Sequence, residues 1–115
     1  MINAGTSRGL ESFFSALADE TRLRIVLHLL ERGASTVQEI SAGIGKSESL
    51  VSHHLSCLRN CGVVRYTRNG RNTVYEVNGD EVREVIQLAI RHARRYSESI
   101  LSCDVLQEEK KPIKL

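Results

Sequence analysis

The chain has no tryptophan, a single proline, and only three tyrosines and two phenylalanines among its 115 residues. Its core must therefore be built mainly from leucine, isoleucine, valine and alanine side chains. Long hydrophobic runs are absent too, and stretches such as Ile25–Leu27 are far too short to cross a bilayer, which excludes membrane anchoring. A chain of this length buries one modest core, so we expect one domain that gains further core by pairing with a second copy.

An apolar stretch is also missing between Met1 and Glu11, where polar residues and glycine stand in place of the hydrophobic region of a signal peptide. We therefore expect the protein to be cytoplasmic. In a reducing compartment, an odd number of cysteines argues against a disulfide framework. The three cysteines can then be buried small residues, redox-active thiols or metal ligands.

The charge is small overall but unevenly distributed. Sixteen basic and 14 acidic residues give a formal net charge of +2. Residues 46–75 contain five basic residues and one acidic residue, Glu48, a net charge of +4, whereas the other 85 residues sum to −2. A concentrated basic segment of this kind is typical of a surface that meets nucleic acid.

Hydrophobic periodicity predicts two helices in the first third of the chain. The first is expected from Leu10, where apolar residues begin to recur at helical spacing. The second opens at Asp19, a good N-cap residue, and ends at Gly33.

Two shorter helices are expected next. Thr36 and Glu39 have the spacing of a capping box, so a helix of about two turns should run from there to the glycines of the turn 43–46. Ser47 caps the following helix, and Gly62 ends it. The apolar stripe of that helix consists of Val51, Leu55 and Leu58. Two short helices joined by such a turn form a helix-turn-helix.

Beyond this point the period changes from helix to strand. Apolar and polar residues alternate over 64–77 on both sides of Asn69–Gly70, a pair favoured in two-residue turns, which predicts a β-hairpin. A last helix should start near residues 78–80 and continue to about Leu101. Residues 1–103 are expected to form a single domain, and 104–115, which include Pro112, a flexible tail.

A helix-turn-helix followed directly by a hairpin predicts an α+β winged-helix fold with four helices, a two-stranded wing and a C-terminal helix. Such a fold lays one helix in the major groove of DNA and touches the backbone with the wing. At about 100° per residue, the polar residues of that helix point away from its apolar stripe. The candidate DNA contacts are Ser47, Ser49, Ser52, His53, Ser56, Arg68 and Arg71. The simpler alternative is an ordinary solvated helix and a charged hairpin.

Four separate segments occur in a fixed order: Ala18–Ile25, Val51–Leu55, Gly62–Val64 and Gly70–Tyr75. Together they resemble the ArsR/SmtB family of bacterial and archaeal repressors over about residues 10–100. The resemblance implies a homodimer that binds operator DNA and is released from it by a metal or metalloid. It also implies a dimer interface made by the first and last helices, with Phe13, Val82, Ile86 and Ile90 as candidate contacts.

Members of that family bind their inducers at several unrelated sites, and most are missing here. Residues 36–42 lack the cysteine pair of arsenic sensors, and no N-terminal cysteine is available for a site like that of the staphylococcal cadmium sensor. A zinc-type site on the last helix needs a carboxylate and several histidines. Aligned on His92, this chain offers Gly79, Glu81 and Arg95 instead.

Cys57, Cys61 and Cys103 remain, and they resemble the ligand set of the CmtR-type sensors of cadmium and lead. Four residues apart on a helix, Cys57 and Cys61 stack on one face, so their sulfurs can share one thiophilic ion. Arsenic(III), antimony(III) or zinc would also suit thiolate ligands, and simple packing or redox sensing stays open.

Histidines near these thiols allow further ligands. His54 lies on the same flank of its helix as Cys57, although a packed histidine is the simpler interpretation of both His54 and His92. Glu81 is most simply a first-turn carboxylate that favours the helix dipole. No acid–base pair is arranged around the thiols, so we do not expect an enzyme.

Overall fold

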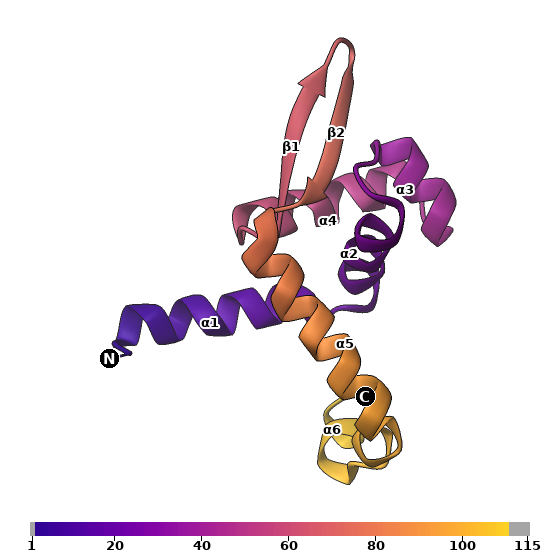
Figure 1. Ribbon diagram of the computed structural model, residues 1–115. Coiled ribbons are helices and arrows are strands. Elements are labelled where there is room, and N and C mark those ends of the chain that lie inside the picture. The colour runs from indigo at the N-terminus through magenta and orange to yellow at the C-terminus, as the bar shows by residue number, and fades with distance from the viewer. Residues whose placement is uncertain (1, 111–115) are drawn as a thin grey trace, which may run out of the picture. The chain divides into compact units, whose positions relative to one another are not determined.

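The computed structural model describes residues 2–110, a range with six helices and one two-stranded sheet (Figure 1). In chain order the elements are α1 (Ala4–Leu17), α2 (Glu20–Arg32), α3 (Val37–Ile44), α4 (Glu48–Asn60), β1 (Val64–Asn69), β2 (Asn72–Val77), α5 (Gly79–Leu101) and α6 (Asp104–Lys110). The helix-turn-helix of α3 and α4, followed by the β1–β2 wing, confirms the predicted winged-helix fold. Every helix in the described range is too short or too polar to span a bilayer.

Helix α1 begins earlier than the sequence predicts, at Ala4 and not at Leu10. The side chain of Asn3 caps it by accepting a hydrogen bond from the Thr6 N–H at 2.9 Å. The first turns of α1 are exposed. They carry no apolar stripe, so hydrophobic periodicity could not find them.

Side-chain caps begin α2 and α3 where the sequence predicts them. The Asp19 carboxylate accepts a hydrogen bond from the Arg22 N–H at 3.0 Å, and Gly33 ends α2 with a φ of 80°. Thr36 and Glu39 form both bonds of the capping box, since each backbone N–H donates to the other's side chain, at 3.0 and 3.2 Å. Both helix starts are thus confirmed.

The end of α4 is a Schellman motif built on Gly62, whose φ is 73°. The Val63 N–H donates to the Leu58 carbonyl at 2.9 Å, and the Gly62 N–H donates to the Arg59 carbonyl at 3.0 Å. Val63 and Leu58 are both fully buried, which adds the apolar contact that usually accompanies this motif. The predicted end of this helix is confirmed, and the chain turns directly into the wing.

The wing is an antiparallel hairpin in which Val64 pairs with Val77 and Asn69 with Asn72. The loop is therefore Gly70–Arg71, one residue further along than the predicted Asn69–Gly70 pair. Gly70 has a φ of 65°, while no other residue type in the described range has a positive φ. A positive φ at the first loop residue alone is the pattern of a type II′ turn, which needs glycine there.

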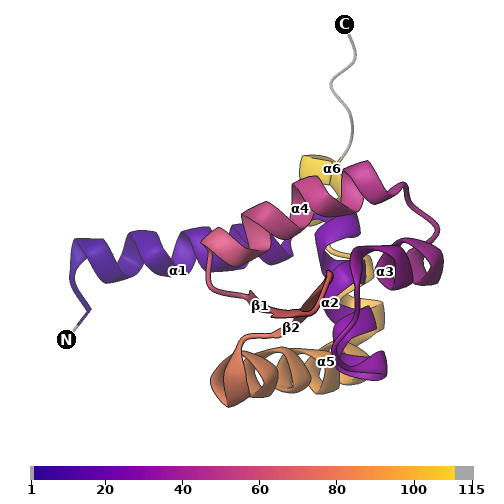
Figure 2. The ribbon, with the colours of Figure 1, turned by 90° about the horizontal axis from the view of Figure 1, so that it is seen from above.

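The core of the winged-helix unit lies where α4 packs against α2, α3 and β1 (Figure 2). Its fully buried side chains include Ile25, Val26, Ile40, Val51, Leu55, Leu58 and Val63. Buried Ser35 pairs with Tyr75 through two backbone hydrogen bonds of 2.8 and 2.9 Å, which tie the segment before α3 to the wing.

The chain divides into two compact units, one up to Arg83 and one from Glu84 onward, so the single domain expected over 1–103 stays a prediction. Helix α5 reaches Leu101 but is kinked at Tyr96, whose φ and ψ are −116° and 19°. Neighbouring serines favour non-helical backbone, whereas no proline marks the kink in the sequence.

The segment expected to be a flexible tail contains a further helix, α6, over Asp104–Lys110. It begins with a first-turn aspartate, and the Gln107 N–H donates to the Cys103 carbonyl at 3.0 Å. A seven-residue helix with no buried side chain leaves no hydrophobic period to detect. Residues 111–115, with Pro112, lie outside the described range.

Replacing Asp19 by Ala should lower the free energy of unfolding by about 1 kcal/mol, because the N-cap of α2 is lost. The hydrogen bond from the Arg22 N–H holds the pKa of the Asp19 carboxyl below its usual value of 3.8. The carboxylate therefore stabilises the fold above that pH, and its contribution disappears as the pH falls further. Urea unfolding at several pH values measures this. Equal stabilities of Asp19→Ala and wild type at pH 7 would contradict it.

Candidate nucleic-acid interface and thiol site

Helix α4 has two chemically distinct faces. Val51, Leu55 and Leu58 are fully buried. The residues predicted to face outward are indeed exposed: Ser49, Ser52, His53 and Ser56. Because the buried stripe fixes the rotation of the helix, these polar side chains form a continuous outer surface available to a partner.

The hydroxyls on this surface differ in whether their protons are already used in hydrogen bonds within the protein. The Ser47 hydroxyl accepts the Leu50 N–H at 3.1 Å as the N-cap of α4, which leaves its own proton available. The Ser56 hydroxyl donates to the Ser52 carbonyl at 3.2 Å, so its proton is already engaged within the helix. The exposed Ser49 and Ser52 hydroxyls are the better placed donors for an outside partner.

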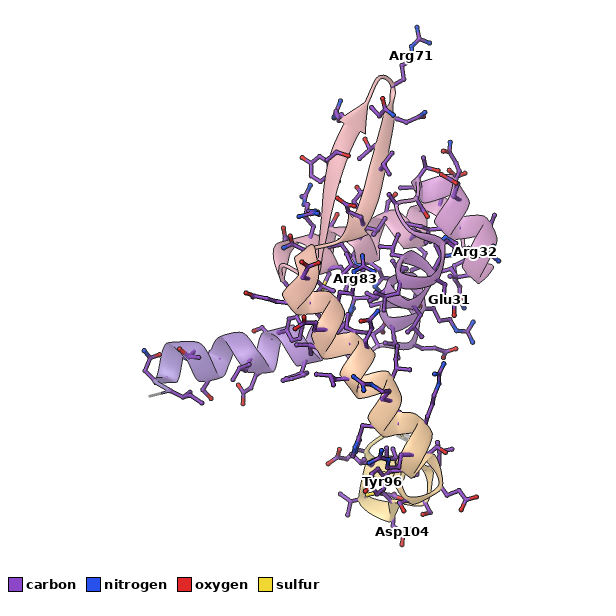
Figure 3. The ribbon with its side chains drawn as sticks, viewed as in Figure 1. Glu31, Arg32, Arg71, Arg83, Tyr96 and Asp104 are labelled. Carbon is purple, nitrogen blue, oxygen red and sulfur yellow. The ribbon has the colours of Figure 1, made fainter. Side chains whose placement is uncertain are left out.

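A groove of about 360 Å³ runs between α4, the start of α3 and the wing. Its lining residues are Thr36, Val37, Gln38, Glu48, Ser49, Ser52, Arg71, Asn72 and Thr73. Figure 3 shows Arg71 at the tip of the wing, pointing away from the helices. Arg68 is exposed on β1 and pairs with Thr73 on β2.

Sequence reasoning missed Gln38 and Asn72 as groove residues. Gln38 follows directly after the first residue of α3, and Asn72 follows the turn of the wing. Both are polar and exposed. Their positions in the sequence, beside a predicted helix start and a predicted turn, could have indicated them.

Cys57 and Cys61 lie together in a second hollow of about 400 Å³ at the other end of α4. Both are half-buried free thiols. The hollow is completed by Arg22 of α2 and by the α1 residues Glu11, Ser12, Ser15 and Ala16. The predicted sharing of one helix face by the two thiols is therefore confirmed, whereas the α1 lining was not foreseen.

Cys103 is also a half-buried free thiol, but it belongs to the unit that begins at Glu84. Within the described part of the chain, no group of three or more His, Cys, Asp or Glu side chains is arranged to hold a metal ion. Within the unit up to Arg83, two of the three cysteines singled out from the sequence lie together.

Burial raises the pKa of the Cys61 thiol, and the neighbouring Cys57, also its hydrogen-bond partner, raises it further. The charge of Arg22 acts in the opposite direction. Two other arginines near this end of α4 are engaged elsewhere: Arg59 lies over the Tyr66 ring at 5.3 Å, and Arg65 pairs with Glu76 at 2.9 Å. Cys61 is consequently a protonated, weakly nucleophilic thiol near neutral pH.

Arg22 connects the thiol hollow with α4. Its guanidinium donates to the Ala16 carbonyl at 2.7 Å and to the Ser15 carbonyl at 3.3 Å, at the end of α1. A third guanidinium nitrogen lies 3.4 Å from Nδ1 of His54. Half-buried His54 thus lies within hydrogen-bonding reach of Arg22, which agrees with a packed histidine. Arg22 lies in the Ala18–Ile25 segment, but its spacing in the sequence does not mark it as a site residue.

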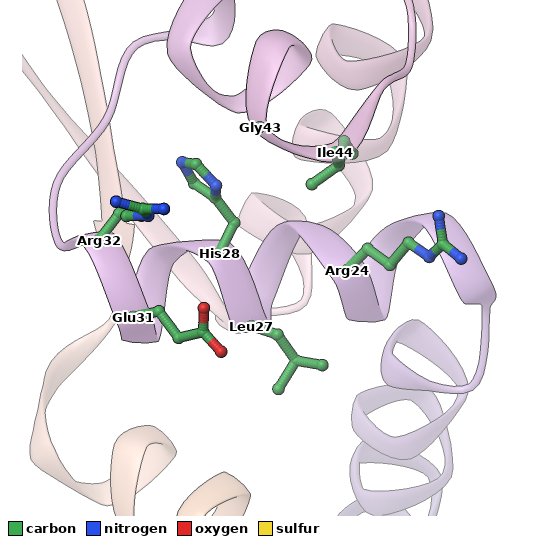
Figure 4. Close-up of a pocket in the computed structure, with 7 residues that line it drawn as sticks. All are labelled: Arg24, Leu27, His28, Glu31, Arg32, Gly43 and Ile44. Atoms are coloured by element: carbon green, nitrogen blue, oxygen red, sulfur yellow. The ribbon is translucent and has the colours of Figure 1, made fainter.

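A third hollow, of about 290 Å³, lies between α2 and α3 and includes His28 and Gly43 (Figure 4). His28 points from α2 toward Gly43, and a Cβ on Gly43 would clash with the imidazole in its present position. The imidazole is also 3.4 Å from the Ser35 hydroxyl. The absence of a side chain at Gly43 leaves the space that the His28 ring occupies.

The remaining predicted residues lie on α1 and α5. Ile86 is already buried within the single chain, whereas Phe13, Val82 and Ile90 are half-buried, so their role in a dimer interface stays a prediction. The His92 ring lies 4.8 Å from the Tyr96 ring. Glu81 is in the first turn of α5, as predicted. Large apolar side chains are exposed on both helices: Leu10 and Phe14 on α1, and Val85 and Leu88 on α5.

Residues 19–66 match the family described as "Bacterial regulatory protein, arsR family". The chain is 32% identical over 81 residues to the cadmium resistance transcriptional regulatory protein CadC homolog of Staphylococcus aureus, covering 70% of this chain and 67% of that protein. It is 48% identical over 60 residues to the HTH-type transcriptional regulator CmtR of Mycobacterium tuberculosis, covering 52% of this chain and 50% of CmtR.

The fold is similar to that of a solved structure from Mycobacterium bovis, the homodimeric winged helix-turn-helix DNA-binding domain of a possible ArsR-family regulator. The TM-score is 0.77 at 27% sequence identity, over 84% of this chain and 88% of that one. With a winged helix-turn-helix and matching relatives over most of its length, the chain belongs to the ArsR/SmtB family of DNA-binding transcriptional regulators.

Proposed function

We propose that the protein is a homodimeric repressor that binds operator DNA through α4 and the wing, and that thiophilic ions release it. Cadmium and lead are the leading inducers. The ligands are Cys57 and Cys61 of one chain together with Cys103 of the partner subunit. The observation that carries the proposal is the pair of thiols sharing one hollow on the helix whose outer face carries the candidate DNA contacts.

The chemistry of the thiol hollow supports a soft cation as its ligand. Two sulfurs on one wall favour a thiophilic ion over magnesium or calcium. The hollow also contains the Glu11 carboxylate, while Arg22 is held by carbonyl oxygens of α1. A bound cation stabilises the Cys61 thiolate, which burial and the neighbouring Cys57 otherwise disfavour. The CadC homolog is named for cadmium resistance, which agrees with this class of ion.

Helix α4 provides the link between inducer and DNA. The thiols lie in its last turns and the exposed serines in its first turns, so tilting or shifting the helix at one end moves the other. Arg22 contributes a second route, because it lines the hollow and also contacts His54, the neighbour of exposed His53. Couplings of about 1 to 3 kcal/mol between two such sites are typical.

Two alternatives concern the same thiols. Arsenic(III) or antimony(III), bound by three thiolates in a pyramidal geometry, would act through the same ligand set, and zinc would also fit. A redox-switched repressor is disfavoured because a thiol with a raised pKa is slow to react with oxidants. Titration of operator binding with each ion under reducing conditions separates these possibilities.

Dimerisation through the first and last helices is supported by their exposed apolar side chains. Leu10 and Phe14 stand four residues apart on α1, and Val85 and Leu88 stand three apart on α5. Each pair therefore lies on one face of its helix. Such apolar faces on a small chain are typical of an interface with a second copy.

Replacing Cys57 or Cys61 by Ser should leave operator binding intact. It should abolish the release of the protein from the operator by cadmium or lead, because one of the two paired thiols is lost. Gel-shift titrations with each ion, under reducing conditions, measure this. Ser12→Ala is a matched control, since it changes the wall of the same hollow without removing a sulfur. Release of the Cys57→Ser protein at the wild-type ion concentration would contradict the ligand assignment.

A mixed dimer tests whether each site is shared between subunits. One chain carries Cys57→Ser and Cys61→Ser, and the other carries Cys103→Ser. Shared sites predict that one of the two thiolate sites survives, because the intact thiol pair meets the intact Cys103 of the partner subunit. Sites within one chain predict none. Ultraviolet charge-transfer absorption titrated with cadmium counts the surviving sites, and a count of zero would defeat the shared arrangement.

Replacing Arg71 by Ala should weaken binding to all DNA sequences alike and reduce the salt slope by about 1, because an arginine at the wing tip neutralises a phosphate. Replacing exposed His53 by Ala should instead change the preference among operator variants. Fluorescence anisotropy at several salt concentrations separates the two effects. A shift in sequence preference for Arg71→Ala would show that the wing reads bases.

A further inference from the structure

The groove between α3, α4 and the wing contains a carboxylate that the basic surface does not explain. Glu48 is the first residue of α4, is exposed, and is the single acidic residue between positions 46 and 75. It lines the groove together with Arg71 and Gln38. A negative charge at this place is repelled by DNA phosphates, so its presence needs a compensating role.

Contacts within the protein do not supply that role. The ion pairs among the described residues join Arg24 to Glu20 and Arg65 to Glu76, and Glu48 takes part in neither. A capping box would need a carboxylate at the third helical position, which Leu50 occupies in α4. A first-turn carboxylate favours the helix dipole, but any surface helix offers that stabilisation without placing the charge against DNA.

Glu48 occupies a position that contacts base edges in helix-turn-helix proteins. In a helix-turn-helix, the N-terminal residues of the second helix contact the bases of the major groove. The donors available to a carboxylate there are the exocyclic amino groups of cytosine and adenine. Adenine presents the N7 acceptor beside its amino group, whereas cytosine presents its amino group without a neighbouring acceptor. A carboxylate, which only accepts hydrogen bonds, is therefore better matched to cytosine.

We propose that Glu48 is a specificity-determining residue that accepts a hydrogen bond from the N4 amino group of a cytosine in each operator half-site. This inference rests on the proposed binding of DNA by α4. Glu48 also rejects other bases, because guanine and thymine present acceptor oxygens at the same edge and would repel the carboxylate. Arg71 supplies the phosphate contact that offsets the added negative charge.

The test is selection from a library of fully randomised DNA duplexes, with sequencing of the bound fraction. Wild type is compared with Glu48→Gln, which keeps the size of the side chain, and with Glu48→Ala. Glu81→Gln is a matched control, since Glu81 is also an exposed first-turn carboxylate, on α5. The Glu48→Gln substitution should change the preferred base at one position per half-site from cytosine to adenine and leave the other positions unchanged. Affinity of Glu48→Gln for the cytosine operator should fall about tenfold.

Two results would contradict the inference, and they have different meanings. If Glu48→Gln binds all sequences more tightly, with an unchanged preference and a steeper salt dependence, the carboxylate is only a repulsive charge near phosphates and the inference is overturned. If the wild type selects no sequence at all, the proposed repressor function fails together with this inference. The two failures are thus distinguished by the wild-type selection alone.

Discussion

The burial of one face of α4 is the constraint on which both sites depend. Val51, Leu55 and Leu58 are fully removed from water against α2, α3 and β1, and each such side chain contributes about 1.5 to 3 kcal/mol. Burial of that face sets the rotation of the helix, so Ser49 and Ser52 face outward. The same packing leaves the end of α4, with its thiols, against α1 and α2.

One helix consequently carries two kinds of chemistry. Its first turns offer hydroxyls and a carboxylate to a groove shared with the wing, and its last turn offers two sulfurs to a hollow shared with α1. From Ser52 to Cys61 the distance along the axis is about 14 Å at 1.5 Å per residue. Arg22 ties the same helix to the end of α1 by bonding carbonyls there and approaching His54. In the proposed function, ligand binding and DNA reading would therefore act on one helix.

Local signals predicted most of the secondary structure. The caps at Asp19 and Thr36 and the stop at Gly62 were found because each depends on residues within a few positions. Three features were not predicted: the start of α1, the kink at Tyr96 and helix α6. No hydrophobic period or proline marks any of them. The wing loop lies one residue later than the sequence predicts. Its position follows from the strand register, which is set by pairing across the hairpin.

The sequence by itself determined which residues of α4 are buried and which are exposed, and that Cys57 and Cys61 share a face, because helical periodicity fixes both. Only the tertiary structure decided what stands opposite them. Arg22 and His54 are 32 positions apart, and Glu11 reaches the thiol hollow from α1. Such contacts depend on how helices pack on one another, and no spacing within a single helix encodes that packing.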